Sequence, residues 1–223
     1  RPSHSYYPAY VKYQGNNDIR GGGHFSGRLT APLVFAGAIA KQILAQKGIT
    51  VGAHILSING VLDDSFDKAN VSDKELLAVS SKAFCVINDE IEDKMRASVE
   101  KSRLDGDSVG GVIECAVVGV PVGIGANIFS TVEGHISSAL FGVPAVKGVE
   151  FGSGFDFAKM TGYEANDTYS ISNGNVKINK NNNGGVLGGM TTGAPIIVRT
   201  VVKPTPSISK AQKSVNLQKM TEE

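Results

Sequence analysis

Residues 89–118 read DEIEDKMRASVEKSRLDGDSVGGVIECAVV, and they place one helix directly before one buried strand. Residues 89–103 predict the helix, because apolar residues recur on one face and the first turn is acidic. The turn-forming residues 105–108, Asp-Gly-Asp-Ser, end it. Residues 109–118 are mostly apolar and predict a buried strand. This order is typical of a protein in which helices cover a sheet.

The same alternation of helix and strand continues on both sides of this stretch. We expect helices over 31–47 and 126–140, and strands over 49–58, 146–151, 185–190 and 195–202. Thr30 is placed to cap the first of these helices, and Asn59-Gly60 is a hairpin-type turn. Residues 1–28 and 177–183 are polar and predict loops. The pattern favours an α/β (or α+β) fold in layers.

Length and charge exclude several classes of protein. The chain has 223 residues, 22 Lys and Arg against 21 Asp and Glu, and a formal net charge of +1. This size suits one large domain or two small ones, with a real core. A net charge near zero argues against a general nucleic-acid binder.

Cysteine content and hydropathy indicate the cellular compartment in which the protein is expected. With only Cys85 and Cys115, a disulfide scaffold and a four-cysteine zinc site are excluded, and both thiols are expected in the core of a protein from a reducing compartment. No uninterrupted apolar run reaches 18 residues and no signal peptide is recognisable. We therefore expect a cytoplasmic protein that does not enter a membrane.

The glycine-rich run Gly21-Gly22-Gly23-His24-Phe25-Ser26-Gly27-Arg28-Leu29-Thr30 is the first candidate site. A loop of this kind that leads into a helix offers backbone N–H groups to an anion, and Arg28 adds a fork of donors suited to phosphate or carboxylate. It lacks the Gly-Lys-Ser/Thr ending of a phosphate-binding P-loop and the spacing of a dinucleotide fingerprint. The alternative is a solvated turn before a helix.

Two further segments have candidate chemistry. His4 is a possible proton carrier near the start of the chain, although a histidine there is often only exposed. Residues 203–207, Lys-Pro-Thr-Pro-Ser, can hold a phosphate or an electron-rich ring at the exit of a strand, or form an ordinary strand end. His54 and His135 are expected to be structural. The histidines lack metal-ligand spacing, so we expect no metal site.

Taken together, a series of short motifs resembles the chorismate synthase family. They are Arg1-Pro2-Ser3-His4, Lys12-Tyr13, Asp18-Ile19-Arg20-Gly21-Gly22-Gly23, Ser26-Gly27-Arg28, Asp107-Ser108-Val109-Gly110-Gly111, the segment 144–152, Asn166-Asp167, the segment 182–189 and Lys203-Pro204-Thr205. Each motif alone is weak, but the ordered set covers nearly the whole chain and is highly specific.

The resemblance implies a fold and a reaction. Members of the family convert 5-enolpyruvylshikimate 3-phosphate to chorismate by 1,4-anti-elimination of phosphate, and they need reduced FMN although the reaction is redox-neutral. They are β-α-β sandwiches, usually homotetramers, and take part in aromatic amino acid biosynthesis. NADPH would be required only in a bifunctional form that reduces its own flavin.

The resemblance also implies roles for individual residues. His4 corresponds to a catalytic proton donor and Arg28 to an arginine that faces the substrate. The residues that correspond to flavin contacts are His24, Phe25, Ser26, Glu164, Ala165, Gly188, Lys203, Pro204, Thr205, Pro206 and Ser207. Two of these depart from the family: many members have arginine in place of His24, and often serine in place of Pro206.

The resemblance further implies that residues 1–223 form a single domain that is incomplete at both ends. Family segments with a second catalytic histidine, further substrate arginines and a Gly-Arg-His-Asp-Pro motif have no counterpart here. Two alternatives therefore stand beside the lyase: a non-catalytic module that binds phosphate or nucleotide, and an inactive structural fragment.

Overall fold

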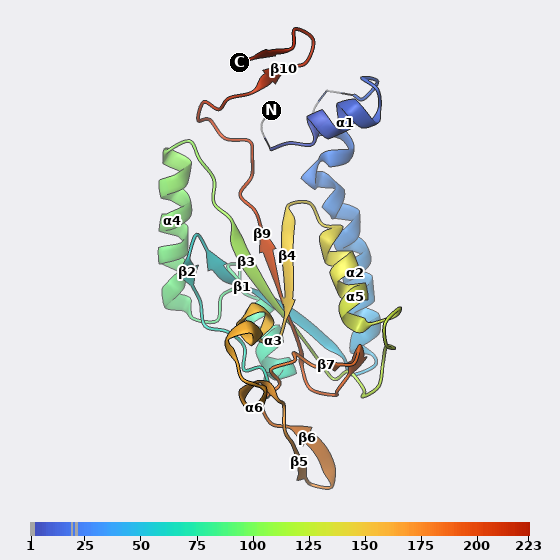
Figure 1. The fold of residues 1–223 in the computed structure, drawn as a ribbon. Helices are drawn as coiled ribbons and strands as arrows, with labels where there is room; N and C mark the ends of the chain where they lie inside the picture. The colour runs from blue at the N-terminus through green and yellow to red at the C-terminus, as the bar shows by residue number, and fades with distance from the viewer. Residues whose placement is uncertain (1–2, 19, 21) are drawn as a thin grey trace.

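A five-stranded antiparallel sheet forms the centre of the computed structural model, which describes all residues except 1–2, 19 and 21 (Figure 1). Its strands are β1 (Thr50–Ile58), β2 (Val61–Leu62), β3 (Gly111–Val118), β4 (Val146–Phe151) and β9 (Ile196–Val202). They are arranged in the order β2-β1-β3-β9-β4, and every neighbouring pair is antiparallel. The predicted class is confirmed in its α+β form.

The described part of the chain forms six α-helices. They are α1 (Tyr6–Lys12), α2 (Thr30–Ala45), α3 (Asp73–Ser80), α4 (Glu92–Leu104), α5 (Val132–Phe141) and α6 (Gly162–Ala165). Helix α3 packs against β1, and α5 packs against β4. Figure 1 shows α2 and α5 on one flank of the sheet and α4 on the other.

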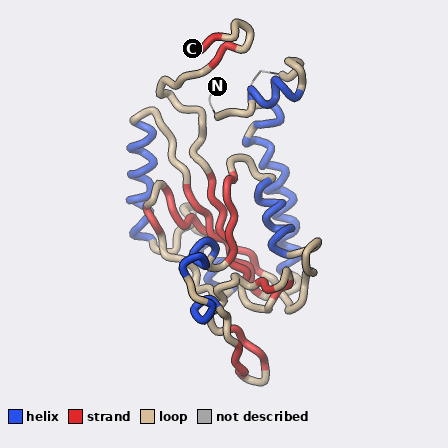
Figure 2. The backbone as a smooth tube through the Cα atoms, viewed as in Figure 1, coloured by secondary structure: helices blue, strands red, loops and turns tan. Residues whose placement is uncertain are grey.

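Three small hairpins lie outside the sheet, and Figure 2 shows them as short red segments joined by tan loops. They are β5–β6 (Tyr169–Ser172 and Asn175–Ile178), β7–β8 (Val186–Leu187 and Met190–Thr191) and β10–β11 (Val215–Asn216 and Thr221–Glu222). The β10–β11 hairpin lies at the same end of the molecule as α1, and the β5–β6 hairpin projects at the opposite end (Figure 1).

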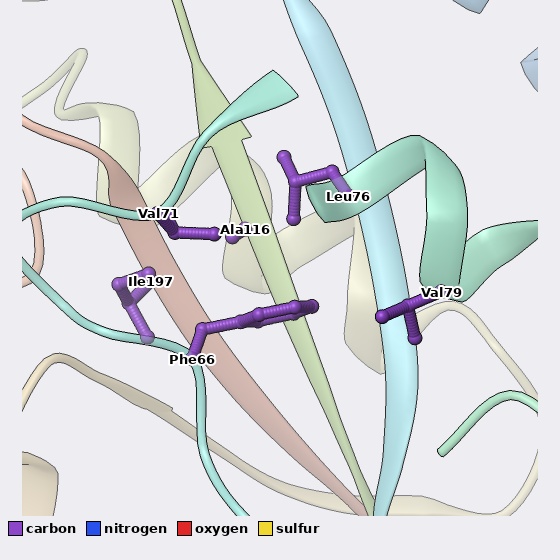
Figure 3. Close-up of a cluster of buried hydrophobic side chains, with 6 residues drawn as sticks. All are labelled: Phe66, Val71, Leu76, Val79, Ala116 and Ile197. Carbon is purple, nitrogen blue, oxygen red and sulfur yellow. The ribbon is translucent and has the colours of Figure 1, made fainter. Parts of the chain in front are cut away.

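The hydrophobic core lies between α3 and one face of the sheet (Figure 3). It consists of Phe66, Val71, Leu76, Val79, Ala116 and Ile197. Gly52 of β1 makes the close approach of α3 possible, because a Cβ there would lie 2.7 Å from the Cβ of Leu76. A larger residue at this position would push the helix off the sheet.

The predicted helix over 126–140 begins six residues late, at Val132. The side chain of Thr131 accepts a hydrogen bond from the backbone N–H of Gly134 and so caps α5 at this point. Upstream, Ile128 has a φ of 55°, which is incompatible with a helix. The apolar spacing was misleading here because Ile128 is 77% exposed and does not belong to the buried face.

Three other expectations were wrong in part. Residues 6–12, predicted as loop, form α1, and residues 175–178 form β6 across the predicted start of a loop. The strand expected over 185–190 is the β7–β8 hairpin, since Gly188 and Gly189 have positive φ. Thr30 begins α2 instead of capping it, and its hydroxyl donates to the carbonyl of Gly27.

Helix α2 has no buried residue, although it is strongly apolar. The helical stretch Gly27–Ala45 has a mean hydropathy of 1.2 over 18 residues, so by length and composition it passes as a membrane span. A single such helix is weak evidence for a membrane, because core helices and signal sequences have the same properties. The fold therefore leaves one long apolar helix uncovered.

Candidate functional site

The first cluster of expected site residues forms where the start of the chain meets the segment after β9. The Nε2 atom of His4 lies 3.0 Å from Oγ of Ser207. The Nζ atom of Lys203 donates to the carbonyl and to the hydroxyl of Ser3, at 3.3 and 3.4 Å. The structure thus brings Ser3 and His4 to Lys203 and Ser207, about 200 positions further along the chain.

The segment 203–207 is held in place by the sheet and by the turn before β3. The backbone N–H of Lys203 donates to the carbonyl of Ala145, and the hydroxyl of Ser108 donates to the carbonyl of Thr205 at 2.7 Å. A Cβ on Gly110 would lie 2.6 Å from the carbonyl oxygen of Val202, so glycine is required for this approach. The Asp-Ser-Val-Gly-Gly turn therefore acts as a support for the candidate site.

An open cavity of about 440 Å³ lies beside His4 and Ser207. It is lined by His4, Pro206, Ser207, Ile208, Ser209, Lys210 and Gln212. None of these lining residues is acidic, but Lys210 is not available to a ligand, because Asp105 and Asp107 pair with its ammonium group. The side chains of His4, Ser207, Ser209 and Gln212 offer polar atoms to a phosphorylated ligand.

The glycine-rich run forms two short 3₁₀ turns, η1 (Gly23–Phe25) and η2 (Gly27–Leu29), directly before α2. The Ser26 hydroxyl accepts the backbone N–H of Arg28, and the ring of Phe25 is half exposed. In the part of the chain that the structure describes, no carboxylate pairs with the Arg28 guanidinium. Gly21, the first residue of the predicted anion-binding run, lies outside the described residues, as do Arg1, Pro2 and Ile19 of the motifs that carry the family resemblance.

The second group of expected flavin contacts lies at the opposite end of the sheet (Figure 1). Glu164 and Ala165 belong to α6, and Gly188 forms the tip of the β7–β8 hairpin with a φ of 59°. Lys203 follows the last residue of β9. Helix α6 is instead hydrogen-bonded to Asn182, and the loop that contains Asn182 is joined to the start of β9 by a hydrogen bond from the Ile197 N–H to the Gly184 carbonyl. At roughly 3.3 Å per residue, the seven residues of β9 span about 20 Å. The expected contacts therefore do not form one cluster within this chain.

Helix α6 begins with a reciprocal capping box. The Thr161 hydroxyl accepts the backbone N–H of Glu164, and a Glu164 carboxylate oxygen accepts the backbone N–H and the hydroxyl of Thr161, each at 2.8 Å. These hydrogen bonds from Thr161 hold the pKa of Glu164 below its ordinary value. The Glu164 side chain is thus engaged in shaping the turn.

Asn182 and Asp167 are central to this end of the molecule, and residue patterns alone assigned them no role. Asp167 accepts the backbone N–H groups of Asn182 and Asn183, at 2.6 and 2.9 Å. The Asn182 side chain donates to the carbonyls of Glu164 and Ala165. The one available signal was the run of asparagines before Gly184, since asparagine favours local hydrogen bonds to backbone.

A second feature that the sequence did not reveal is a buried line of hydrogen-bonded polar side chains across the sheet. Nδ1 of His54 lies 3.1 Å from Asp63, and its Nε2 lies 3.0 Å from Glu114. Glu114 also accepts from Nε of Arg199, whose Nη1 reaches Glu150. His54, Asp63 and Glu114 are fully buried, which agrees with the structural role expected for His54.

Opposing effects act on the pKa of Glu114. Burial raises this pKa, but hydrogen bonds from His54, from the Phe66 N–H and from Arg199 outweigh burial, so the net shift is downward.

Two other kinds of site find no support. Burial raises the pKa of the Cys115 thiol to about 11, which makes it unreactive. Among the described residues, no group of three or more His, Cys, Asp or Glu is placed to hold a metal ion.

The chain is similar to known proteins over its whole length. A family model described as chorismate synthase matches residues 1–223. The chorismate synthase of Thermococcus gammatolerans is 49% identical over 222 residues, and that of Korarchaeum cryptofilum is 46% identical over 218 residues. These alignments cover 100% and 98% of this chain but 60% and 59% of the relatives, so the chain spans less than two thirds of their length.

The fold gives the same result as the sequence. A crystal structure of a chorismate synthase superposes with a TM-score of 0.80 and 32% sequence identity, over 88% of this chain and 62% of that chain. The match of the family model to every residue, together with this superposition, leaves one assignment. The chain belongs to the chorismate synthase family.

Proposed function

We propose that the protein containing this chain catalyses the 1,4-anti-elimination of phosphate from 5-enolpyruvylshikimate 3-phosphate to give chorismate. The observation that carries the proposal is the meeting of His4 with Ser207 and of Lys203 with Ser3, in a chain that matches the family over all its residues. In this reaction the C–O bond to phosphate and one C–H bond break, the ring gains one C=C bond, and phosphate and a proton leave.

The residues at the His4 end suit a phosphorylated flavin. Lys203 adds a positive charge, Ser207 offers a hydroxyl, and no acidic residue lines the adjoining cavity. We infer that His24, Phe25, Ser26 and the segment 203–207 hold FMN. When bound in its reduced form, FMN would supply an electron-rich ring next to the substrate, and the protein would supply orientation and charge.

His4 and Arg28 have separate roles in this proposal. The substrate carries a phosphate and two carboxylates, and the Arg28 guanidinium provides a charge-assisted fork for one of them. Ser207 contacts Nε2 of His4 and so orients the imidazole ring, which in this proposal delivers a proton to a developing negative charge. Histidine is suited to this role because it gains and loses a proton near neutral pH.

The separation of the two groups of expected contacts supports assembly into a homotetramer. Within one copy, β9 lies between the His4 end and the Glu164 end. We infer that a neighbouring copy brings its Glu164, Ala165 and Gly188 to the flavin. Mixing a His4→Ala form with an Ala165→Trp form of the intact protein tests this inference, because activity would return only if one site draws on two copies.

The reaction itself is tested with the protein expressed from its complete reading frame. It is supplied with 5-enolpyruvylshikimate 3-phosphate and photoreduced FMN, and phosphate release is measured. Release that requires reduced flavin is expected. Tight binding of nucleotides with no preference for flavin, and without phosphate release, would instead indicate the non-catalytic binding module.

A further inference from the structure

The Asn182 side chain connects α6 to the central sheet. Its Nδ2 atom donates to the carbonyl oxygens of Glu164 and Ala165, at 3.1 and 3.3 Å. Its Oδ1 atom accepts the hydroxyl of Ser153, which follows β4, at 3.1 Å. One amide group therefore fixes the backbone of a four-residue helix relative to the end of a sheet strand.

The hydrogen bonds that link the sheet to α6 all donate in the same direction, from Lys68 toward α6. The Lys68 ammonium group donates to Oγ of Ser153 at 3.0 Å, so the Ser153 hydroxyl proton is free to point toward Asn182. Ser153 is only 2% exposed, so its hydroxyl is shielded from water, whereas Asn182 is half-buried. Burial, and to a lesser extent Arg199, lower the pKa of Lys68. Lys68 donates to Ser153, Ser153 donates to Asn182, and Asn182 donates to the carbonyls of Glu164 and Ala165.

The backbone of Asn182 is fixed as firmly as its side chain. Its N–H donates to Asp167 at 2.6 Å, and its carbonyl accepts the N–H of Ser153 at 2.7 Å. A Cβ on Gly152 would clash with the Asn182 carbonyl, so glycine is required for the close approach of the two chain segments. A side chain held this firmly can orient the groups that it binds.

We propose that Asn182 is a positioning residue that holds the Glu164–Ala165 backbone in the orientation needed for flavin contact. The proposal rests on the proposed function for the flavin, but the hydrogen bonds that carry it belong to this chain alone. Asn182 acts through α6 and touches no reacting atom.

Replacing Asn182 with aspartate removes the hydrogen-bond donor and keeps the size of the side chain. Asn182→Asp keeps the shape of the side chain but places an acceptor opposite the carbonyls of Glu164 and Ala165, where only a donor can bind. Ser153→Ala is a second variant, which removes the hydroxyl that orients the amide. Asn175→Asp, at the exposed start of β6, is the matched control for the change of charge.

Two measurements on the intact protein test the proposal. Hydrogen exchange followed by mass spectrometry reports the amides of Ala165 and Asn166, which bond within α6. Fluorescence titration with oxidised FMN, at saturating 5-enolpyruvylshikimate 3-phosphate, reports flavin affinity. Val79→Ala, in the core cluster, serves as a variant that lowers stability without touching the hydrogen bonds of Asn182.

In Asn182→Asp, we expect exchange over residues 161–167 to be faster by about tenfold and the FMN dissociation constant to rise by about tenfold. Ser153→Ala should change both in the same direction by less, while Asn175→Asp and Val79→Ala leave FMN affinity unchanged. Unchanged exchange in Asn182→Asp would overturn the positioning role, and faster exchange with unchanged affinity would overturn its link to the flavin. If the unmodified protein binds no FMN, the proposed function fails, while the exchange data still decide whether Asn182 holds α6.

Discussion

At the scale of single residues, the two ends of the proposed site differ in how they are held. The side chains of His4 and Lys203 contact Ser207 and Ser3 beside an open cavity. The buried groups around His54 are held on every side by hydrogen bonds. We therefore expect substitutions at the first set to change activity, and substitutions at the second set to change stability.

Arg28 is expected to bind a substrate anion. In the intact protein, Arg28→Ala should weaken substrate binding by about 2–5 kcal/mol, because a desolvated anion would lose its paired cation. The dissociation constant measured by calorimetry checks this expectation. Arg103→Ala is the matched control, since Arg103 pairs with Glu100 on exposed α4 and should leave binding intact. Equal affinities of Arg28→Ala and the unmodified protein would remove Arg28 from the site.

His4 is expected to donate a proton. His4→Ala should lower turnover by about 10²–10⁴-fold with the fold retained, which is the range for loss of a general acid. His135→Ala is the control, because the His135 side chain lies on the exposed surface of α5 and its ring contacts Ser130. Steady-state phosphate release and circular dichroism are measured for both. Near-normal turnover in His4→Ala would contradict the assigned role.

Glu114 should make stability depend on pH on the acid side. Because its pKa is lowered in the folded protein, its charged form stabilises the fold above the ordinary value of 4.5. This contribution is lost as the pH falls through the lower, folded-state pKa. Chemical unfolding between pH 7 and pH 3 should therefore show a flatter acid decline in Glu114→Gln than in the unmodified protein. An unchanged slope would show that Glu114 does not drive acid unfolding.

His54 should have a large effect on stability at neutral pH. His54→Ala would leave two buried carboxylates, Asp63 and Glu114, without the ring that lies between them. Removal of one partner from a buried charged network costs about 3–5 kcal/mol. Urea unfolding measures this loss, with His135→Ala as the exposed control. A change below the error of the measurement would mean that water or movement of neighbouring groups replaces the ring.

At the scale of secondary structure, caps and glycines set boundaries that apolar spacing did not predict. The strand over 49–58 was predicted within one residue, and the helix over 89–103 is observed as α4, preceded by a 3₁₀ turn at Asp89–Ile91. The start of α5 was misplaced because Thr131 provides a cap that competes with an apolar repeat. The expected strand over 185–190 failed because two glycines with positive φ turn the chain.

The Thr131 cap is expected to contribute measurably to α5. Thr131→Ala should lower the free energy of unfolding by about 1 kcal/mol, because the Gly134 N–H loses its side-chain acceptor. Thermal unfolding checks this value, with Thr221→Ala in the exposed β11 as the control. A loss equal to that of the control would show that solvent satisfies the helix end equally well.

At the scale of the whole molecule, the sequence predicted the family and the sheet but not the distribution of the site. The ordered motifs identified residues such as Ala165 and Ser207, yet linear order carries no information on which end of a sheet each one reaches. That depends on the pairing of β9 with β3 and β4, which joins residues about 50 to 90 positions apart. The hydrogen bonds that join Lys68, Ser153, Asn182 and Glu164 could not be predicted either, since these residues come from four separate segments.

The exposed apolar helix α2 leads to a prediction for the 223-residue chain tested by itself. Phe35, Ile39 and Ile43 recur every four residues on one face, yet they are 70, 45 and 51% exposed. Uncovered apolar surface of this extent promotes association. Sedimentation velocity should therefore show self-association, and Phe35→Glu should shift the chain toward monomer without loss of helicity, whereas Lys47→Glu, just beyond α2, should not.

The same chain is expected to have no measurable phosphate release. It spans less than two thirds of the length of its relatives, and by resemblance the remainder includes a second catalytic histidine and further arginines. Catalytic groups that act as a unit are strongly non-additive, so the loss of several leaves little more than residual binding. The assay uses chain verified by mass as residues 1–223, with 5-enolpyruvylshikimate 3-phosphate and photoreduced FMN. Release above a control without protein would show that His4, Arg28 and their neighbours suffice, and would refute the division of the site between this chain and the rest of the family's length.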